Sequence, residues 1–306
     1  MRGQPFRKRL KYSALYWTLR TAIFLSRITP RRLWLGFFGW IGGLVYTFRS
    51  KYRDLVIYHL ELAFGREKSH GEILDLSREV YVMLGRNGAE SLRSVTLTSR
   101  KQLDGFVTVT GLEHAERARA KGKGVVYFTG HCGAWELMIR IFALHGHPML
   151  VIGTTLKDPR INELVMGIRR FQGSEPVERG KDMFRLIKNL KKGGGVAVLI
   201  DQDTKVKSRI VNFFGLPAAT PVGAAVLAMK TGAAVIPATI HLGADWRQHL
   251  EIYPEVELEN TGDEEKDLVT NTQKFTEILE AHIRRHPAQW VWMHERWKTK
   301  PGEEEQ

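Results

Sequence analysis

Short, continuous apolar segments alternate with helical segments from residue 106 onward, and this alternation is the strongest constraint on the fold. Two of the apolar segments, Val125-Val-Tyr-Phe128 and Val196-Ala-Val-Leu-Ile200, contain no polar residue that could face solvent. Such segments are typical of strands buried on both faces, and the intervening helices provide crossover connections. The pattern predicts strands at 106–110, 125–128, 148–152, 196–200, 234–240 and 250–253. It predicts helices at 112–120, 134–144, 159–171, 181–191, 222–231 and 264–285. We therefore expect an α/β fold with a mostly parallel central sheet flanked by helices.

The amino-terminal segment differs from the rest of the chain in charge. Residues 1–53 contain twelve Lys or Arg and no Asp or Glu, so they supply +12 of the formal net charge of +13. Aromatic side chains are interspersed with this charge, which is typical of helices at a lipid headgroup interface. A nucleic-acid enzyme would more often distribute basic residues around its cleft, so we expect no nucleic-acid partner. We predict a helical membrane anchor at 1–50 and a second domain at 51–306.

The length of the apolar run in this segment indicates whether the anchor spans the membrane or lies in its surface. The uncharged run at 33–48 has sixteen residues and four glycines, whereas a spanning helix needs about 20 apolar residues. We therefore predict a membrane-embedded or surface-lying anchor that is held to an anionic, cytoplasmic leaflet by its basic residues. A single span and a basic helix pair packed on the protein itself remain alternatives. Beyond the anchor, helices are expected at 55–64 and 73–91, the second beginning with a capping box formed by Ser69 and Glu72.

Several chemistries find no support in the residue patterns. The single Cys132 excludes an intrachain disulfide framework, and no Gly-x-Ser-x-Gly nucleophile elbow is present. Cys132 itself is an unfavourable nucleophile candidate because it adjoins His131, and consecutive side chains seldom converge. The eleven histidines show no convincing paired-ligand spacing, so we expect no zinc site and no cofactor.

The clearest functional motif is Thr129-Gly-His-Cys-Gly-Ala-Trp-Glu136, which directly follows a predicted buried strand. Ligands of open α/β sheets bind at the carboxyl ends of strands. A turn between strand and helix could bring Glu136 back to His131, where a carboxylate would fix the imidazole tautomer and make the other nitrogen a better base. Such a base could remove a proton from an alcohol that attacks a thioester. The alternative is a histidine that only caps the following helix.

Two further segments could contribute to a site. Asp201-Gln-Asp203 also follows a buried strand, and its acids could bind a polar substrate group, orient the site or hold a metal. A solvated turn is the alternative. Phe213-Phe-Gly-Leu-Pro-Ala-Ala-Thr-Pro221 is expected to be an apolar loop, with Thr220-Pro221 as the N-cap and first residue of the next helix. Packing is the favoured role for this loop on its shape alone.

Taken together, these motifs resemble the late acyltransferases of bacterial lipid A biosynthesis, within the wider lysophospholipid-acyltransferase group. The resemblance covers nearly the whole chain. It depends on the basic aromatic amino terminus and on five motifs: Gly130-His131-x4-Glu136, Arg169-Arg170, Leu199-Ile-Asp-Gln-Asp203, Phe213-Phe-Gly-x-Pro-Ala-x-Thr-Pro221 and Gln289-Trp-x-Trp-x-His-x-Arg-Trp-Lys-Thr-x-Pro301. Cys132, Ala134, Glu295 and the 205–209 run depart from the family pattern, which leaves the acceptor open.

The resemblance implies transfer of a fatty acyl chain from acyl carrier protein or acyl-CoA to a hydroxyl of a lipid A precursor. His131 would be the general base and Glu136 its orienting residue. Arg169 or Arg170, of which only one can face the site, would bind an acceptor phosphate or stabilise an oxyanion.

Other residues of the predicted site follow from this assignment. Asp201 would pair with that arginine or with an acceptor hydroxyl, and Asp203 would also contact substrate. We expect Phe213 and Phe214 in the wall of an apolar acyl groove. Three alternatives remain open: the same chemistry on another glycolipid or on a lysophospholipid, an inert lipid carrier, and a metal-dependent phosphohydrolase that would use Asp201, Asp203 and His131.

Overall fold

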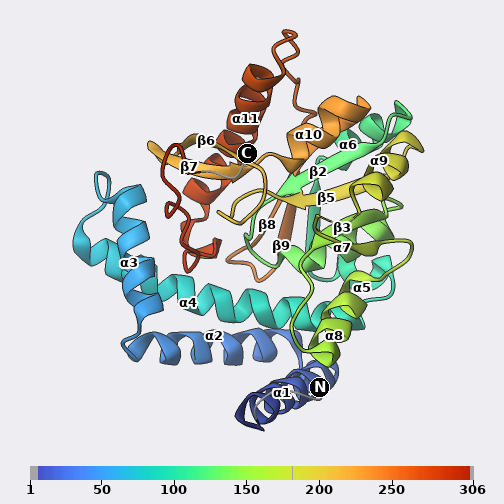
Figure 1. Cartoon of the computed structure of the whole chain (residues 1–306). Coiled ribbons are helices and arrows are strands. Elements are labelled where there is room, and N and C mark those ends of the chain that lie inside the picture. Colours follow the sequence, from blue (N-terminus) through green and yellow to red (C-terminus); the bar gives the residue numbers. More distant parts are fainter. Residues whose placement is uncertain (1–5, 181, 304–306) are drawn as a thin grey trace.

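The computed structural model describes residues 6–180 and 182–303 and confirms an α/β fold with a mostly parallel central sheet (Figure 1). The sheet has seven strands in the order β1-β9-β8-β2-β5-β3-β4. Their bounds are β1 (Val107–Thr110), β9 (Gln248–Ile252), β8 (Ala234–Leu242), β2 (Val125–Thr129), β5 (Gly195–Leu199), β3 (Met149–Gly153) and β4 (Glu175–Glu178). Five neighbouring strands from β8 to β4 are parallel, and β9 and β1 run in the opposite direction. Residues 1–5 of the predicted anchor and Lys181, at the start of a predicted helix, lie outside the described residues.

The central strands are buried on both faces, as their unbroken apolar sequences predict. Along β2, Val125 and Tyr127 pack into the core on one side of the sheet, while Val126 and Phe128 pack into the core on the other. This alternation is the period of two that strand geometry imposes. Helices therefore cover both faces, with α7 (Trp135–Leu144) and α6 (Leu112–Ala120) on one side and α10 (Gly223–Thr231) and α11 (Glu264–Arg285) on the other. The remaining elements of this part of the chain are α5 (Arg100–Asp104), α8 (Pro159–Arg169), α9 (Met183–Lys191), η1 (Ser94–Thr96) and η2 (Pro287–Gln289).

The segment predicted as an apolar loop is instead a two-stranded antiparallel hairpin, β6 (Ser208–Phe213) and β7 (Leu216–Pro221). Its two turn residues, Phe214 and Gly215, have φ angles of 54° and 76°. Positive φ at both positions is the geometry of the type I′ turn, whose twist matches that of the flanking strands. The prediction that Thr220-Pro221 starts a helix was wrong, because both residues pair with β6 and α10 begins at Gly223 after the N-cap Val222.

Four amino-terminal helices form a platform beside the α/β domain: α1 (Phe6–Ile28), α2 (Arg31–Thr47), α3 (Lys51–Phe64) and α4 (His70–Arg93). The predicted capping box at Ser69 and Glu72 opens α4. Helices α2 and α4 lie side by side, and two glycines allow the close approach (Figure 1). A Cβ on Gly42 would lie 2.1 Å from the Tyr81 carbonyl oxygen, and one on Gly85 would lie 2.2 Å from that of Phe38. Gly42 of the uncharged run and Gly85 of α4 thus serve helix packing.

One face of α2 is covered by α4, and the opposite face is uncovered. Trp34, Leu35 and Tyr46 are buried, whereas an apolar stripe on the other side is exposed. The stripe comprises Leu33, Phe37, Trp40, Leu44 and Phe48. Among the described residues, no helix combines the length and the apolar character that a membrane span requires.

Candidate active site

His131 and Asp201 meet because the strands that precede them are neighbours in the sheet. β2 and β5 are parallel, with Thr129 opposite Leu199, so the residues that follow both strands reach the same edge. His131 Nδ1 lies 2.8 Å from Asp201 Oδ1, and the His131 backbone N–H donates to Asp201 Oδ2 at 2.7 Å. The carboxylate is therefore bound by both the ring and the backbone of one residue, which fixes the position of the imidazole.

A third donor to Asp201 comes from the carboxyl-terminal string. The indole Nε1 of Trp290 donates to Asp201 Oδ2 at 2.7 Å. Burial alone would raise the pKa of Asp201, but the charge of His131 and the hydrogen bonds from His131 and Trp290 lower it to about 2. Asp201 is thus a carboxylate across the physiological range, and it accepts a hydrogen bond from His131 Nδ1–H.

The other ring nitrogen of His131 is left as the basic atom. A neutral imidazole with its proton on Nδ1 carries a lone pair on Nε2. The side chain is 20% exposed and lines a cavity, while the Trp135 ring packs edge-on against it with centroids 5.1 Å apart. The backbone around it is fixed by the segment that follows α11, since Val291 N–H donates to the His131 carbonyl oxygen at 3.2 Å. The imidazole can therefore act as a preorganised base.

Glu136, the carboxylate that the sequence analysis assigned to His131, pairs instead with Arg169. The two oxygens of Glu136 lie 3.0 Å and 3.2 Å from Arg169 Nε, and both side chains are mostly buried. Burial would lower the pKa of Arg169, but the hydrogen bond and charge of Glu136 raise it, so the guanidinium is charged. Gly153, which ends β3, provides the space: a Cβ there would lie 2.0 Å from Arg169 Nη1. The carboxylate that orients His131 is therefore Asp201, which the sequence had placed with an arginine or a substrate hydroxyl.

Arg170 is directed away from Arg169, as expected for adjacent residues. Helix α8 ends at Arg169, and Arg170 follows it with an extended backbone. Its guanidinium forms an ion pair with Glu163 at 2.6 Å and is 53% exposed. Of the two predicted arginines, Arg169 is the one that the structure places on a residue of the His131–Glu136 motif.

Asp203 and the two phenylalanines were predicted to contact substrate, but they form structural contacts here. Asp203 accepts hydrogen bonds from the backbone N–H and the hydroxyl of Thr299 at 2.9 Å and 3.0 Å. Its carboxylate is thus directed at the carboxyl-terminal string and does not converge with His131 and Asp201. Phe213 and Phe214 are buried among the tryptophans of that string, including Trp290 and Trp292, and do not line the cavity beside His131.

A cavity of about 400 Å³ opens beside His131. Apolar side chains from four elements form most of its wall: Ile152, Met183, Leu186, Val198 and Val226. Arg179, Lys205 and Lys207 also border it. The cavity therefore combines an apolar interior, basic groups and the base Nε2, which is the composition expected of a small-molecule site.

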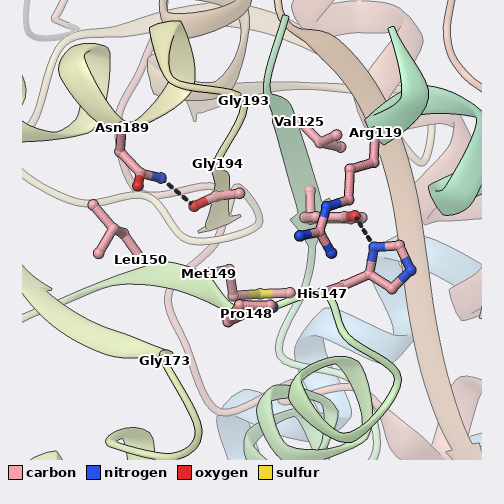
Figure 2. A pocket seen from close by; sticks show the side chains of 12 residues that line it. Arg119, Val125, His147, Pro148, Met149, Leu150, Gly173, Asn189, Gly193 and Gly194 are labelled. Atoms are coloured by element: carbon pink, nitrogen blue, oxygen red, sulfur yellow. Dashed lines mark hydrogen bonds between the residues drawn. The ribbon is translucent and has the colours of Figure 1, made fainter. Parts of the chain in front are cut away.

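A second, smaller cavity of about 140 Å³ lies at the amino ends of the strands (Figure 2). Its polar groups are occupied with one another: Tyr127 and His147 are hydrogen-bonded at 3.4 Å, and Asn189 donates to the Gly195 carbonyl oxygen at 2.8 Å. Since catalytic groups of α/β sheets lie at the carboxyl ends of strands, the candidate active site is the cavity beside His131.

The role of Trp290 was not predicted from the sequence. The Gln289–Pro301 string was used only as part of the family resemblance. A buried tryptophan needs a hydrogen-bond acceptor for its N–H, and this requirement could have pointed to a partner such as Asp201. The role of Asp201 as the partner of His131 was also missed. This pairing depends on the order of the strands in the sheet, and hence on the tertiary structure.

Comparisons with known proteins show the family of this chain. Residues 3–299 match the family described as bacterial lipid A biosynthesis acyltransferase. The chain is 28% identical to the phosphatidylinositol mannoside acyltransferase of Mycobacterium tuberculosis over 70% of this chain and 67% of that protein. It is 25% identical to a lipid A biosynthesis acyltransferase of Haemophilus influenzae over 94% and 90%, and 27% identical to the lipid A biosynthesis lauroyltransferase of Escherichia coli over 85% and 84%. The chain therefore belongs to the bacterial lipid A biosynthesis acyltransferase family and is an O-acyltransferase.

Proposed function

We propose that this enzyme transfers a fatty acyl chain from the thioester of acyl carrier protein or acyl-CoA to a hydroxyl of a lipid A precursor. The observation that carries the proposal is the His131–Asp201 pair at the wall of an apolar cavity of about 400 Å³. A base beside an apolar cavity meets the two needs of the reaction, which are deprotonation of an alcohol and burial of a hydrocarbon chain.

In the proposed mechanism, His131 Nε2 removes the proton of the acceptor hydroxyl as its oxygen attacks the thioester carbonyl carbon. A tetrahedral oxyanion forms, and the imidazolium is stabilised by the Asp201 carboxylate through Nδ1–H. When the intermediate collapses, the new C–O ester bond is retained and the C–S bond breaks. The thiolate takes the proton from His131 Nε2, which restores the neutral imidazole.

We assign the Glu136–Arg169 pair to the acceptor. Arg169 is charged, and a guanidinium can bind a phosphate through two parallel hydrogen bonds. Glu136 acts as a positioning residue that holds this guanidinium over Gly153, at the carboxyl end of β3. The acceptor phosphate would therefore lie at the same edge of the sheet as His131, with Arg169 alternatively available to an oxyanion.

The donor is assigned to the cavity. Its apolar wall would hold the acyl chain, and the thioester would lie next to His131, which lines the same space. Arg179, Lys205 and Lys207 border this cavity, and both candidate donors carry phosphate groups that basic side chains can bind.

We further propose that the platform docks on an anionic bilayer, at the cytoplasmic face of the inner membrane. Trp17 and Phe24 of α1 are exposed, as is the stripe of α2, and residues 1–53 supply +12 of the formal net charge of +13. Aromatic side chains with Lys and Arg match the chemistry of the headgroup region. The other face of α2 packs on α4, so the anchor would be monotopic and continuous with the enzyme.

The proposal is tested by incubating the full-length protein with acyl carrier protein thioester or acyl-CoA and a lipid acceptor, followed by mass spectrometry of the lipids. Formation of an acylated lipid A precursor, lost in His131→Ala, is the expected result. If only a mannosylated phosphoinositide is acylated, the proposed acceptor is wrong and the proposed chemistry stands. This acceptor is included because the chain is 28% identical to a phosphatidylinositol mannoside acyltransferase. Lipid binding without acyl transfer to any acceptor would overturn the proposed reaction and favour a lipid carrier.

A further inference from the structure

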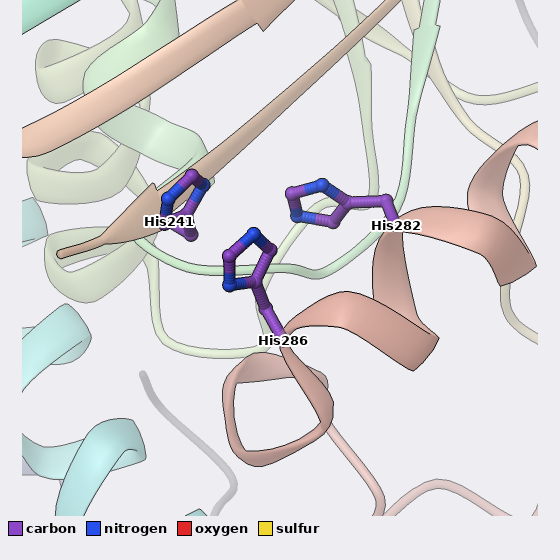
Figure 3. Close-up of side chains that lie close together, drawn as sticks. All are labelled: His241, His282 and His286. Carbon is purple, nitrogen blue, oxygen red and sulfur yellow. The ribbon is translucent and has the colours of Figure 1, made fainter.

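Three histidine side chains converge where the carboxyl end of β8 meets the last turn of α11 (Figure 3). His241 comes from β8, and His282 and His286 come from the end of α11, four residues apart and hence on one face of the helix. A ring nitrogen from each of them lies within 4.8 Å of the other two. The sequence analysis expected no zinc site, because the eleven histidines show no convincing paired-ligand spacing along the chain.

His282 is held in the tautomer that leaves a lone pair facing the cluster. Its Nδ1 lies 2.9 Å from Thr239 Oγ1, the Thr239 hydroxyl lies 3.2 Å from the Tyr253 oxygen, and Tyr253 donates to Glu251 at 2.6 Å. Since the carboxylate only accepts, the chain of donors runs from His282 Nδ1–H through both hydroxyls to Glu251. His282 Nε2 then carries no proton, and it is fully buried without a hydrogen-bond partner.

His241 presents a second buried nitrogen to the same region. Its Nδ1 also has no hydrogen-bond partner, since Glu251 Oε1 is 3.8 Å away. Unpaired buried polar atoms are costly, and a cluster of them calls for an explanation. The third ring, that of His286, stacks on His241 with centroids 3.7 Å apart and is partly exposed, so it can rotate.

We propose that His241, His282 and His286 form a binding site for a transition-metal dication of the zinc type. Neutral imidazole nitrogens are preferred ligands of such ions, and three protein ligands with one open position are a common arrangement. The open position would take water or Glu251, whose carboxylate also offsets the charge of the ion and is itself paired with Arg285 at 3.1 Å.

The chemistry and the dimensions of the cluster fit this ion. Burial and the neighbouring His286 imidazole lower the pKa of His282 to about 3 and that of His241 to about 4, so both rings are neutral at pH 7. Zinc–nitrogen bonds of 2.0–2.1 Å place the ligand atoms of a tetrahedral site about 3.3 Å apart. Binding therefore draws the nitrogens closer than the 4.8 Å limit of the metal-free arrangement, and rotation of His286 provides the movement.

A metal at this position would link α11 to β8 just before the Gln289–Pro301 string. His286 precedes Trp290 by four residues, and Trp290 donates to Asp201. Between them, Gln289 exchanges two hydrogen bonds of 2.8 Å with the backbone of Leu242, the residue after His241. The ion would thus reinforce an existing connection between β8 and the segment that supports Asp201, which is a structural role and not a step of the reaction.

The test uses untagged full-length protein, titrated with Zn²⁺ by calorimetry and with Co²⁺ by visible absorption. We expect saturable one-to-one binding, Co²⁺ bands of a four-coordinate site, and a melting temperature that rises with the metal concentration. His286→Gln and His282→Gln should each weaken binding by at least about 100-fold. Thr239→Val, which removes the hydrogen bond that fixes the tautomer of His282, should weaken it about 10–100-fold.

A matched control removes histidines that are outside the cluster. The double variant His70→Gln/His145→Gln should bind Zn²⁺ as the parent protein does. Equal affinity in His286→Gln, in the control and in the parent protein would overturn the proposal, as would the absence of saturable binding. His286→Gln alters a partly exposed side chain and is expected to fold, which circular dichroism checks. None of these readouts depends on acyl transfer, so failure of the metal site and failure of the proposed function are distinguishable.

Discussion

The carboxylate of Asp201 lies 2.8 Å from His131 Nδ1, although seventy positions separate the two residues in the chain. Each residue follows a strand, and the two strands are hydrogen-bonded neighbours in the sheet. The backbone N–H of His131 donates to the other oxygen of the same carboxylate, and the indole N–H of Trp290 donates to that oxygen as well. The pairing of β2 with β5 therefore orients the His131 imidazole, and the His131–Asp201 pair is held rigidly by the sheet.

Asp201→Asn should abolish most turnover while the protein remains folded. The amide is isosteric, but it presents a donor as well as an acceptor and cannot stabilise an imidazolium, so kcat should fall about 10²–10⁴-fold, as in His131→Ala. The measurement is steady-state acyl transfer with circular dichroism on the same samples. Asp203→Asn is the matched control: it loses its Thr299 contact and stability, yet kcat should stay within a few-fold. Comparable losses of kcat in both variants would contradict the assignment.

Arg169→Lys should raise KM for a phosphorylated acceptor about tenfold or more and spare KM for the donor. Lysine keeps the charge but lacks the planar pair of N–H groups that binds phosphate, and it cannot reproduce the forked hydrogen bonds of the Arg169 guanidinium to Glu136. Both KM values are measured with one substrate held in excess. Arg170→Lys, on the exposed side of the same helix end, should leave both unchanged. Equal effects of Arg169→Lys on donor and acceptor would show that Arg169 does not bind the acceptor.

Val226→Phe should shift the preferred acyl chain toward fewer carbons. Val226 lines the cavity beside His131, and a larger side chain there shortens the space for hydrocarbon. Each methylene that no longer enters costs about 0.8 kcal/mol, or about fourfold in affinity. Competition between thioesters of different length measures the preference. Phe214→Leu, which alters the buried core away from the cavity, should lower stability and leave the preference intact; a shift in Phe214→Leu alone would place the groove elsewhere.

Phe37→Glu/Trp40→Glu should release the protein from anionic vesicles. Both rings are exposed on the uncovered face of α2, and full burial of such a side chain is worth about 1.5–3 kcal/mol, so the double change should cost at least tenfold in partitioning. Vesicle co-sedimentation at low and high salt measures it. Phe184→Glu, an exposed aromatic on α9, is the control that should still bind. Undiminished binding of the double variant would place the membrane contact on another surface.

In the absence of metal, the free energy of unfolding should decrease as the pH falls below about 6.5. The folded protein holds the pKa of His282 near 3, whereas an unfolded histidine titrates near 6.5, so between these values the unfolded state binds more protons. One such group contributes a slope of about 1.4 kcal/mol per pH unit. Denaturant titrations from pH 7 to pH 5 measure the slope, and His282→Gln should reduce it. Equal slopes in both proteins would contradict the lowered pKa.

Local signals determined much of the fold. The helices at 112–120 and 264–285 have the predicted bounds, because an amphipathic period and the residues at a helix terminus act within a few residues of each other. The strands that contain Val125–Phe128 and Val196–Leu199 were predicted because an apolar run bounded by turns needs burial on both faces. The position of His131 and Asp201 at strand ends was therefore determined by sequence alone. Strand β4 and the hairpin of β6 and β7 were missed. Glu175–Glu178 is short, contains a proline and has a glutamate at each end, and Phe214-Gly215 is an uncommon turn sequence for its type.

The partner of each functional residue was decided only by the tertiary structure. Glu136 is near His131 in sequence and was the natural carboxylate to assign, yet in the first turn of α7 it is directed to Arg169. Asp201 reaches His131 because β5 inserts between β2 and β3 in the sheet, an order that depends on how all the strands and helices pack. The same holds for His241, which meets His282 and His286 only when α11 lies on β8. Hydrogen bonds and ligand sets act over a few ångströms in space, whereas sequence patterns report on neighbours along the chain, so the residues were visible in the sequence and their pairing was not.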